Sequence, residues 1–197
     1  MAGTEKKPGL RGYAGNKFAC NVYPMSPFAA GRHMAVERLS ECDCGKVQVK
    51  AVGGPILSCV CYCDDCQAGG RKLEELGARG FRDQWGGTPL LVYRDDRIER
   101  VKGADLLRAV KLKDDSPTTR FIATCCNSAM YLKYRPGWWT SMYTARFKGD
   151  VPKLQMRSQT QHAPKGADLP RDAPIYRSFP AALFLRLLRA RLAMVFG

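Results

Sequence analysis

Short runs of apolar residues alternate with polar ones through the middle of the chain, from residue 41 to residue 147. Residues 46–52 alternate so that Val47 and Val49 fall on one face, which is the pattern of a half-buried strand. Turns rich in glycine, proline and aspartate separate further runs that predict six more short strands, at residues 90–93, 98–101, 106–112, 120–124, 130–134 and 142–147. The pattern therefore predicts a mainly β fold made of several small strands.

One helix is expected inside this β region, over residues 65–76. Gly77 follows it directly, and glycine is a common residue just past the end of a helix. Gly69 and Gly70 inside the helix each cost about 1 kcal/mol relative to alanine. The two internal glycines therefore count against this helix, and the terminal Gly77 favours it.

A second helix is expected at the C-terminus, over residues 178–196. Pro180 suits its first turn, and apolar side chains recur at helical spacing: Leu185, Leu188, Leu192 and Val195. Charged positions lie around the helix: Arg186, Arg189 and Arg191. Such a helix either rests on a membrane surface or a partner, or docks its apolar stripe onto its own domain. We favour docking, with weak contact to a membrane surface as the alternative.

Composition divides the chain into three segments. Residues 1–36 are rich in glycine, alanine, proline and lysine and show no sustained period, which predicts a disordered leader. Residues 37–150 form the expected β domain. Residues 151–197 form a basic segment, in which a polar linker precedes the C-terminal amphipathic helix.

The formal net charge of +14 lies mostly in the flanking segments. Residues 1–36 carry 5 basic and 1 acidic side chain, residues 37–150 carry 19 and 15, and residues 151–197 carry 8 and 2. A nucleic-acid-binding domain concentrates positive charge on its own surface. The near-balance of the central segment therefore argues against a nucleic-acid partner.

Nine cysteines are the main chemical feature of the chain. No apolar run reaches the roughly 18 residues that span a membrane, and the N-terminus lacks the apolar core and cleavage site of a secretory signal. We therefore expect a cytoplasmic protein without a transmembrane segment. In a reducing compartment, clustered cysteines are more often metal ligands or reactive thiols than disulfides.

The densest cysteine motif is Cys61-Tyr62-Cys63-Asp64-Asp65-Cys66. On a strand, residues i and i+2 point the same way, so Cys61 and Cys63 present their sulfurs on one face. A turn through the two aspartates can bring Cys66 back to the same ion. Three thiolates leave the fourth position of a tetrahedral zinc ion for water, substrate or another ligand, as in catalytic zinc sites.

A second motif, Cys42-Asp43-Cys44, can hold another zinc ion in the same way. Cys125 and Cys126 are the cysteines left to complete a four-sulfur site, some 80 residues later, and such a site would be structural. Adjacent side chains on a strand point to opposite faces, so both can bind one ion only at a turn or bulge. The remaining two are expected to be a buried thiol, Cys59, and an exposed one in the leader, Cys20.

Other catalytic arrangements are poorly represented in the sequence. The only histidines are His33 in the leader and His162 in the expected linker. A cysteine–histidine or serine–histidine mechanism therefore lacks a base inside the central domain.

The order of these motifs resembles the glutathione-dependent formaldehyde-activating enzyme and centromere protein V family. The likeness covers about residues 38–150, and the stretches VCYCDDCQ (60–67) and CCNS (125–128) are most similar to a bacterial branch without an assigned function. The resemblance implies a small, zinc-ribbon-like, multi-stranded β fold with two zinc ions. It implies a structural zinc bound by the first C-x-C and a late C-x-x-C, and a labile zinc at C-x-C-x-x-C, where the glutathione adduct would bind.

By this resemblance, Cys42, Cys44 and Cys126 belong to the structural site. The labile site, which would also be the catalytic one, is formed by Cys61, Cys63 and Cys66. The chain departs from the family at Ala123, where the late C-x-x-C expects a cysteine, and Cys125 is the expected replacement.

Three functions remain open at the level of sequence. The first is a zinc-dependent carbon–sulfur lyase, or related enzyme, acting on a small thiol adduct of the glutathione type. The second is a non-catalytic zinc module that binds a protein or nucleic acid through its basic flanks. The third is a redox or metal sensor, because an open thiolate site is also oxidisable.

Overall fold

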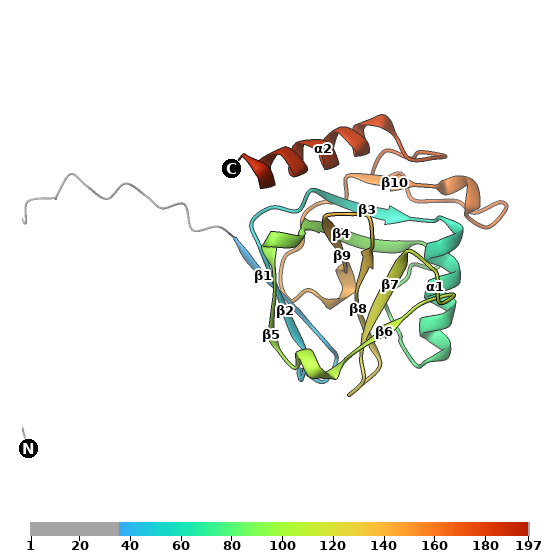
Figure 1. Ribbon diagram of the computed structural model, residues 1–197. Helices are drawn as coiled ribbons and strands as arrows, with labels where there is room; N and C mark the ends of the chain where they lie inside the picture. The colour runs from blue at the N-terminus through green and yellow to red at the C-terminus, as the bar shows by residue number, and fades with distance from the viewer. Residues whose placement is uncertain (1–35, 197) are drawn as a thin grey trace, which may run out of the picture. The chain divides into compact units, whose positions relative to one another are not determined.

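Ten strands in two sheets and two α-helices make up the computed structural model, which describes residues 36–196 (Figure 1). This confirms the predicted fold class, mainly β with a C-terminal helix. The expected disordered leader, together with Cys20 and His33, lies outside the described residues, apart from Val36.

The smaller sheet has three antiparallel strands in the order β1 (Glu37–Glu41), β2 (Gln48–Val52) and β5 (Ile98–Lys102). The larger sheet has seven strands, in the order β10 (Met156–Ser158), β3 (Leu57–Cys61), β4 (Thr88–Arg94), β9 (Trp139–Tyr143), β8 (Ser128–Tyr134), β7 (Thr118–Ala123) and β6 (Leu107–Val110). Its neighbours pair antiparallel, except that β10 runs parallel to β3.

The helices are α1 (Asp64–Glu75) and α2 (Ala181–Val195). Four short 3₁₀ turns connect other elements, at η1 (Asp95–Arg97), η2 (Ala104–Leu106), η3 (Thr144–Arg146) and η4 (Thr160–His162).

The seven-stranded sheet is buried on both faces, and each face has its own hydrophobic core. Alternation along β4 sends Leu90 and Val92 into the core that contains Leu73 of α1. The same alternation sends Leu91 and Tyr93 into the other core, together with the buried residues of β2. One core therefore lies between the sheet and α1, and the other between the two sheets.

Local chemistry explains why α1 begins and ends where it does. The Cys63 sulfur caps the N-terminus by accepting a hydrogen bond from the Cys66 backbone N–H at 3.4 Å. Gly77, with a φ of 99°, ends the helix. A Cβ atom on Gly69 would lie 2.0 Å from Cζ of Arg120, so this glycine allows a strand side chain to approach the helix closely.

Residues 156–158 form a short strand, β10, within the segment that the sequence predicts to be a linker. Met156 pairs with Cys59 and Ser158 with Cys61, and all three residues of β10 are buried. The strand has no recognisable apolar alternation because it is three residues long and Met156 is its only apolar residue; its central residue, Arg157, is charged. That side chain is stabilised by Asp172, whose carboxylate accepts its hydrogen bonds at 2.9 and 3.0 Å.

The strands β1 and β3 were also not expected from the sequence. All five residues of β3 are buried, because β4 and β10 flank it. A strand covered in this way has a continuous apolar run instead of alternation, and such a run is hard to assign from periodicity.

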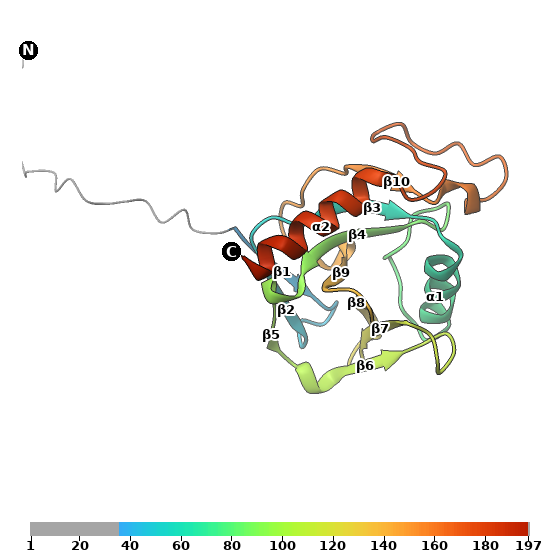
Figure 2. The same ribbon diagram turned by 45° about the horizontal axis from the view of Figure 1, so that its top comes forward.

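The C-terminal helix forms as expected, but it docks through a different face. It lies beside β3 and β4 in both views (Figures 1 and 2), and its less exposed side chains recur at helical spacing: Leu183, Leu187, Ala190 and Met194. The stripe expected to dock is 47–58% exposed: Leu185, Leu188, Leu192 and Val195. The error arises because apolar residues lie on both faces of α2, so their spacing cannot select the docked one.

Candidate metal centres

Four cysteine sulfurs from two turns converge into one cluster. The turn between β1 and β2 supplies Cys42 and Cys44, and the turn between β7 and β8 supplies Cys125 and Cys126; all four sulfurs lie within 4.8 Å of one another. The measured sulfur–sulfur distances include 3.6 Å for Cys42–Cys44, 3.3 Å for Cys44–Cys125 and 3.8 Å for Cys42–Cys125. Four thiolates bound tetrahedrally to zinc at about 2.3 Å would be separated by about 3.8 Å. The donor set and spacing therefore fit a zinc ion.

A tight turn brings the two adjacent cysteines to the same side. Residues 124–127 form the turn, the Cys126 backbone N–H donates to the carbonyl of Ala123 at 3.3 Å, and Asn127 has a φ of 55°. Asparagine tolerates this left-handed conformation better than most residues. Ala123, the residue three positions before Cys126, is fully buried in strand β7. Because of this turn, the sulfur of Cys125 lies in the same cluster as the sulfur of Cys126.

A polar network surrounds the four-cysteine cluster. Asp43, between the first two cysteines, accepts hydrogen bonds from the hydroxyl of Ser128 at 2.7 Å and from the buried Arg146. The Ser128 hydroxyl also lies 3.2 Å from the Cys126 sulfur. Burial raises the pKa of Cys126, but this hydroxyl and nearby backbone N–H groups outweigh burial and lower that pKa to about 6. The network therefore orients the cysteine motif and favours a thiolate at Cys126.

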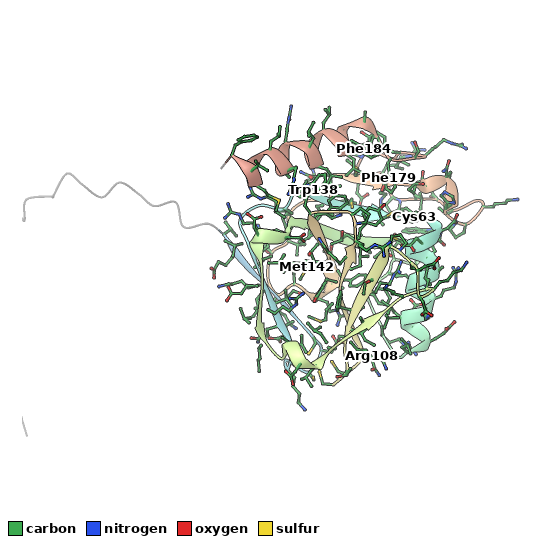
Figure 3. The ribbon with its side chains drawn as sticks, in the orientation of Figure 1. Cys63, Arg108, Trp138, Met142, Phe179 and Phe184 are labelled. Atoms are coloured by element: carbon green, nitrogen blue, oxygen red, sulfur yellow. The ribbon has the colours of Figure 1, made fainter. Side chains whose placement is uncertain are left out.

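The three sulfurs of Cys61, Cys63 and Cys66 form a second cluster, also within 4.8 Å of one another. Cys61 is the last residue of β3, and Cys66 lies in the first turn of α1. Between them, Cys63 caps the helix, and Figure 3 labels it. The thiols of Cys61 and Cys66 hydrogen-bond to Cys63, which lowers the pKa of Cys63 and raises theirs. This cluster can hold a metal ion and leaves one tetrahedral position without a protein ligand from the cluster.

A buried arginine also supports the second cluster. Arg120 of β7 is 1% exposed, and its Nη2 donates to the carboxylate of Asp65 at 2.7 Å and to the Asp65 backbone carbonyl at 2.6 Å. Asp65 lies between Cys63 and Cys66, so the arginine fixes the first turn of α1. Both clusters thus contain an aspartate inside the cysteine motif that is bound by a buried arginine from a distant part of the chain.

His162 lies closer to the three-cysteine cluster than its place in the sequence suggests. Its Nδ1 is 2.9 Å from a carboxylate oxygen of Asp64, the residue after Cys63. Gln67 joins the same region, because its side-chain amide donates to the carbonyls of Tyr62 at 2.8 Å and His162 at 2.5 Å. Sequence reasoning assigned this histidine to a linker, and strand β10 is the reason that it reaches the cluster.

Three functional candidates were missed from the sequence: Arg120, Arg146 and His162. A signal was available for the first, because Thr118, Arg120 and Ile122 alternate on the buried face of β7. A charged residue at such a position needs a partner. Nothing comparable marks the other two, because their partners come from far along the chain.

The two clusters lie on opposite faces of the seven-stranded sheet. Cys42, Cys125 and Cys126 belong to the core between the sheets, whereas the three-cysteine cluster belongs to the core under α1. Cys59 is buried beneath the second cluster without joining it, and burial raises its pKa to about 12. This agrees with the expectation of an inert buried thiol.

Two open cavities of about 280 Å³ each lie away from both clusters. They share Phe121 and Lys133, and no cysteine lines either of them. None of the helices within residues 36–196 is long and apolar enough to cross a membrane.

The chain shows little similarity to known proteins. No protein-family model matches the chain. No curated protein matches it either. Among solved structures, the chain is similar to the crystal structure of a Rhodobacter sphaeroides protein determined by the Northeast Structural Genomics effort. That similarity has a TM-score of 0.41 and 16% sequence identity, and it covers 59% of this chain and 92% of the other. At this level the likeness carries no inference about function.

Proposed function

We propose that the chain binds two zinc ions, a structural one at the four-cysteine cluster and a reactive one at the three-cysteine cluster. The observation that carries this proposal is the difference in sulfur number between two clusters that are otherwise built alike. Four thiolates complete a tetrahedral ion, and three leave a position for an exogenous ligand. Zinc is favoured over other metals because sulfur-only tetrahedral sets in a reducing compartment are typical of it.

For the second site we propose enzymatic chemistry on a small thiol adduct of the glutathione type, as a carbon–sulfur lyase or a related enzyme. The resemblance of the cysteine motifs to the formaldehyde-activating family supports this substrate class. Zinc at such a site supplies a Lewis acid that can hold a sulfur or polarise an oxygen. The chain itself contributes Asp64 and His162, which are hydrogen-bonded beside the cluster and can carry a proton.

The first test of this proposal is zinc stoichiometry in purified protein. We expect two zinc ions in the wild type and one in each of Cys42→Ser and Cys61→Ser. Cys59→Ala is the matched control, because Cys59 lies two residues before Cys61 on the same strand but outside the cluster, and it should retain both ions. A Cys61→Ser protein that still holds two ions would contradict the assignment of the second site.

The second test is turnover of hydroxymethyl adducts of glutathione and other small thiols by the zinc-loaded protein. Cys61→Ser should abolish turnover, and Cys59→Ala should leave it intact. Equal turnover by the wild type and Cys61→Ser would exclude chemistry at this cluster.

A second candidate function is a non-catalytic zinc module. The observation that favours it is that neither of the two cavities described above touches a cysteine. The two functions differ in the accessibility of the second ion. A chromophoric chelator should remove zinc from a reactive site quickly, and small thiols should bind to the ion there. Zinc that resists both reagents would favour the structural module.

We also propose a cytoplasmic location. All eight cysteines within residues 36–196 are free thiols. Thiolate sites with an open position persist where the compartment keeps cysteines reduced. Labelling free thiols in freshly lysed cells tests this, and disulfide-linked protein would contradict it.

A further inference from the structure

The C-terminal part of the chain carries an exposed apolar surface. Of the twelve large hydrophobic side chains that are exposed within residues 36–196, eight lie between Ile175 and Phe196. We call these eight residues the α2 patch: Ile175, Phe179, Phe184, Leu185, Leu188, Leu192, Val195 and Phe196. Figure 3 marks Phe184 on the helix and Phe179 just before it. A concentration of exposed apolar side chains in one segment usually marks an interaction site.

The patch residues from Phe184 to Phe196 occupy one side of a helix whose other side already packs on the domain. Leu183 packs against the core under α1, and the remaining less exposed positions follow it at helical spacing. The guanidinium of Arg191 lies 5.5 Å from the centre of the Trp138 ring, and Arg186 donates a hydrogen bond to Gln155 at 2.7 Å. These contacts fix the helix on the sheet, so the patch is presented on a rigid support.

The segment that carries the α2 patch has charged side chains of one sign only. Residues 173–196 contain four arginines and no acidic residue: Arg177, Arg186, Arg189 and Arg191. At 100° per residue, Arg189 and Arg191 fall on the two flanks of the exposed stripe formed by Leu185, Leu188 and Leu192. An apolar stripe flanked by cationic side chains is the arrangement of helices that lie in the plane of a membrane surface.

We propose that the α2 patch binds the surface of an anionic lipid membrane. The leucines and phenylalanines would enter the interface, and Arg189 on the flank of the stripe would meet lipid headgroups. A second copy of the chain fits less well. Pairing two patches would bring arginines against arginines, with no carboxylate on either helix to neutralise them.

Flotation with lipid vesicles tests this proposal on the purified full chain. We expect it to float with phosphatidylcholine vesicles that contain phosphatidylserine, and to bind pure phosphatidylcholine much less. Added salt should weaken the binding. Leu188→Glu/Leu192→Glu should lower the apparent affinity at least about tenfold, because each change removes an inserted side chain and adds a repelled charge.

The matched control is Val101→Glu/Val151→Glu, which makes the same charge change at two exposed valines outside the patch. This control should bind nearly as well as the wild type. Both double variants should keep the zinc content and the circular dichroism spectrum of the wild type, since all four positions are exposed. Arg189→Gln should weaken binding to anionic vesicles to a smaller degree.

Three results would overturn the proposal. The first is a wild-type protein that does not float with anionic vesicles. The second is equal binding by the wild type and Leu188→Glu/Leu192→Glu. The third is a wild-type dimer in light scattering that Leu188→Glu/Leu192→Glu converts to a monomer while vesicle binding is absent, because a second copy would then cover the patch.

Discussion

Single residues outside the cysteine motifs decide how the sulfurs are held. Each motif contains an aspartate that a buried arginine binds, Asp43 with Arg146 and Asp65 with Arg120. A buried guanidinium without its carboxylate partner is costly in free energy. Each aspartate is therefore held at the position where it pairs with its arginine. Because the aspartate lies between two cysteines, that geometry is transmitted to the sulfurs.

Replacing each of the two arginines in turn should change the zinc affinity of one cluster and leave that of the other unchanged. Arg120→Met should lower zinc affinity at the three-cysteine cluster about 10- to 100-fold, the range seen when groups that orient metal ligands are removed. It should leave the four-cysteine cluster unchanged, and Arg146→Met should have the opposite effect. Competition with a chromophoric chelator on the wild type and the two variants measures both affinities. Loss of both sites in both variants would indicate general unfolding instead of local orientation.

The close approach of Arg120 to α1 makes a second residue-level prediction. Gly69→Ala places a Cβ atom 2.0 Å from the guanidinium carbon, and we expect it to destabilise the protein by about 1–3 kcal/mol. Gly54→Ala is the control, because a Cβ there meets nothing within 4 Å and its φ is not in the left-handed region; its effect should stay within about 0.5 kcal/mol. Urea unfolding measures both, and a neutral Gly69→Ala would show that Arg120 can move away at little cost.

At the scale of secondary-structure elements, the two faces of α2 differ in what they contact. Leu187 is partly buried against the domain, and Leu188, the next residue, is 53% exposed. Leu187→Asp should lower the free energy of unfolding by about 1–3 kcal/mol, because it places a charge in an apolar contact. Leu188→Asp should change that free energy by less than about 0.5 kcal/mol. Equal effects in urea unfolding would mean that α2 does not dock through the face described above.

Elements stabilised by local contacts were predictable from the sequence, and those stabilised by distant contacts were not. A strand that alternates, such as β2 with its buried Val49 and Ala51, and the helix that ends before Gly77 were predicted from local pattern alone. Spacing within a motif also indicated that the sulfurs of Cys61, Cys63 and Cys66 would meet. The meeting of the first motif with Cys125 and Cys126 was inferred only because these were the cysteines left over. Strand β10 was not predictable, because the feature that stabilises it is a contact between Arg157 and Asp172 on the far side of a loop. The docked face of α2 was not predictable either, because both of its faces are apolar.

On the scale of the whole molecule, the four-cysteine cluster joins turns from the two sheets. Cys42 and Cys125 are 83 residues apart, so a metal ion bound there closes a long loop. In the chain-entropy account, a cross-link over a loop of this length contributes about 4 kcal/mol. A metal ion at the three-cysteine cluster would link Cys61 and Cys66, which are only five residues apart. Such a link constrains the unfolded chain far less.

Removing the two ions should therefore have unequal effects on global stability. Cys42→Ser should lower the free energy of unfolding by several kcal/mol, and Cys61→Ser by clearly less, when both are compared with Cys59→Ala. A chelator that removes both ions from the wild type should lower the free energy of unfolding somewhat more than Cys42→Ser does, because that variant keeps the second ion. Urea unfolding with and without chelator measures these differences, and a larger effect of Cys61→Ser would contradict the structural role of the first cluster.

Strand β10 also has a consequence for self-association. It pairs with the outer side of β3, whose five residues are all buried and none of which is charged. A polypeptide that ended at residue 150 would leave this side of β3 as a bare sheet edge with unpaired backbone groups. Exposed apolar edges of this kind are templates for strand addition between molecules. By covering this edge, β10 should prevent aggregation. A protein that ends at residue 150 should form intermolecular β-structure even if both cysteine clusters stay intact.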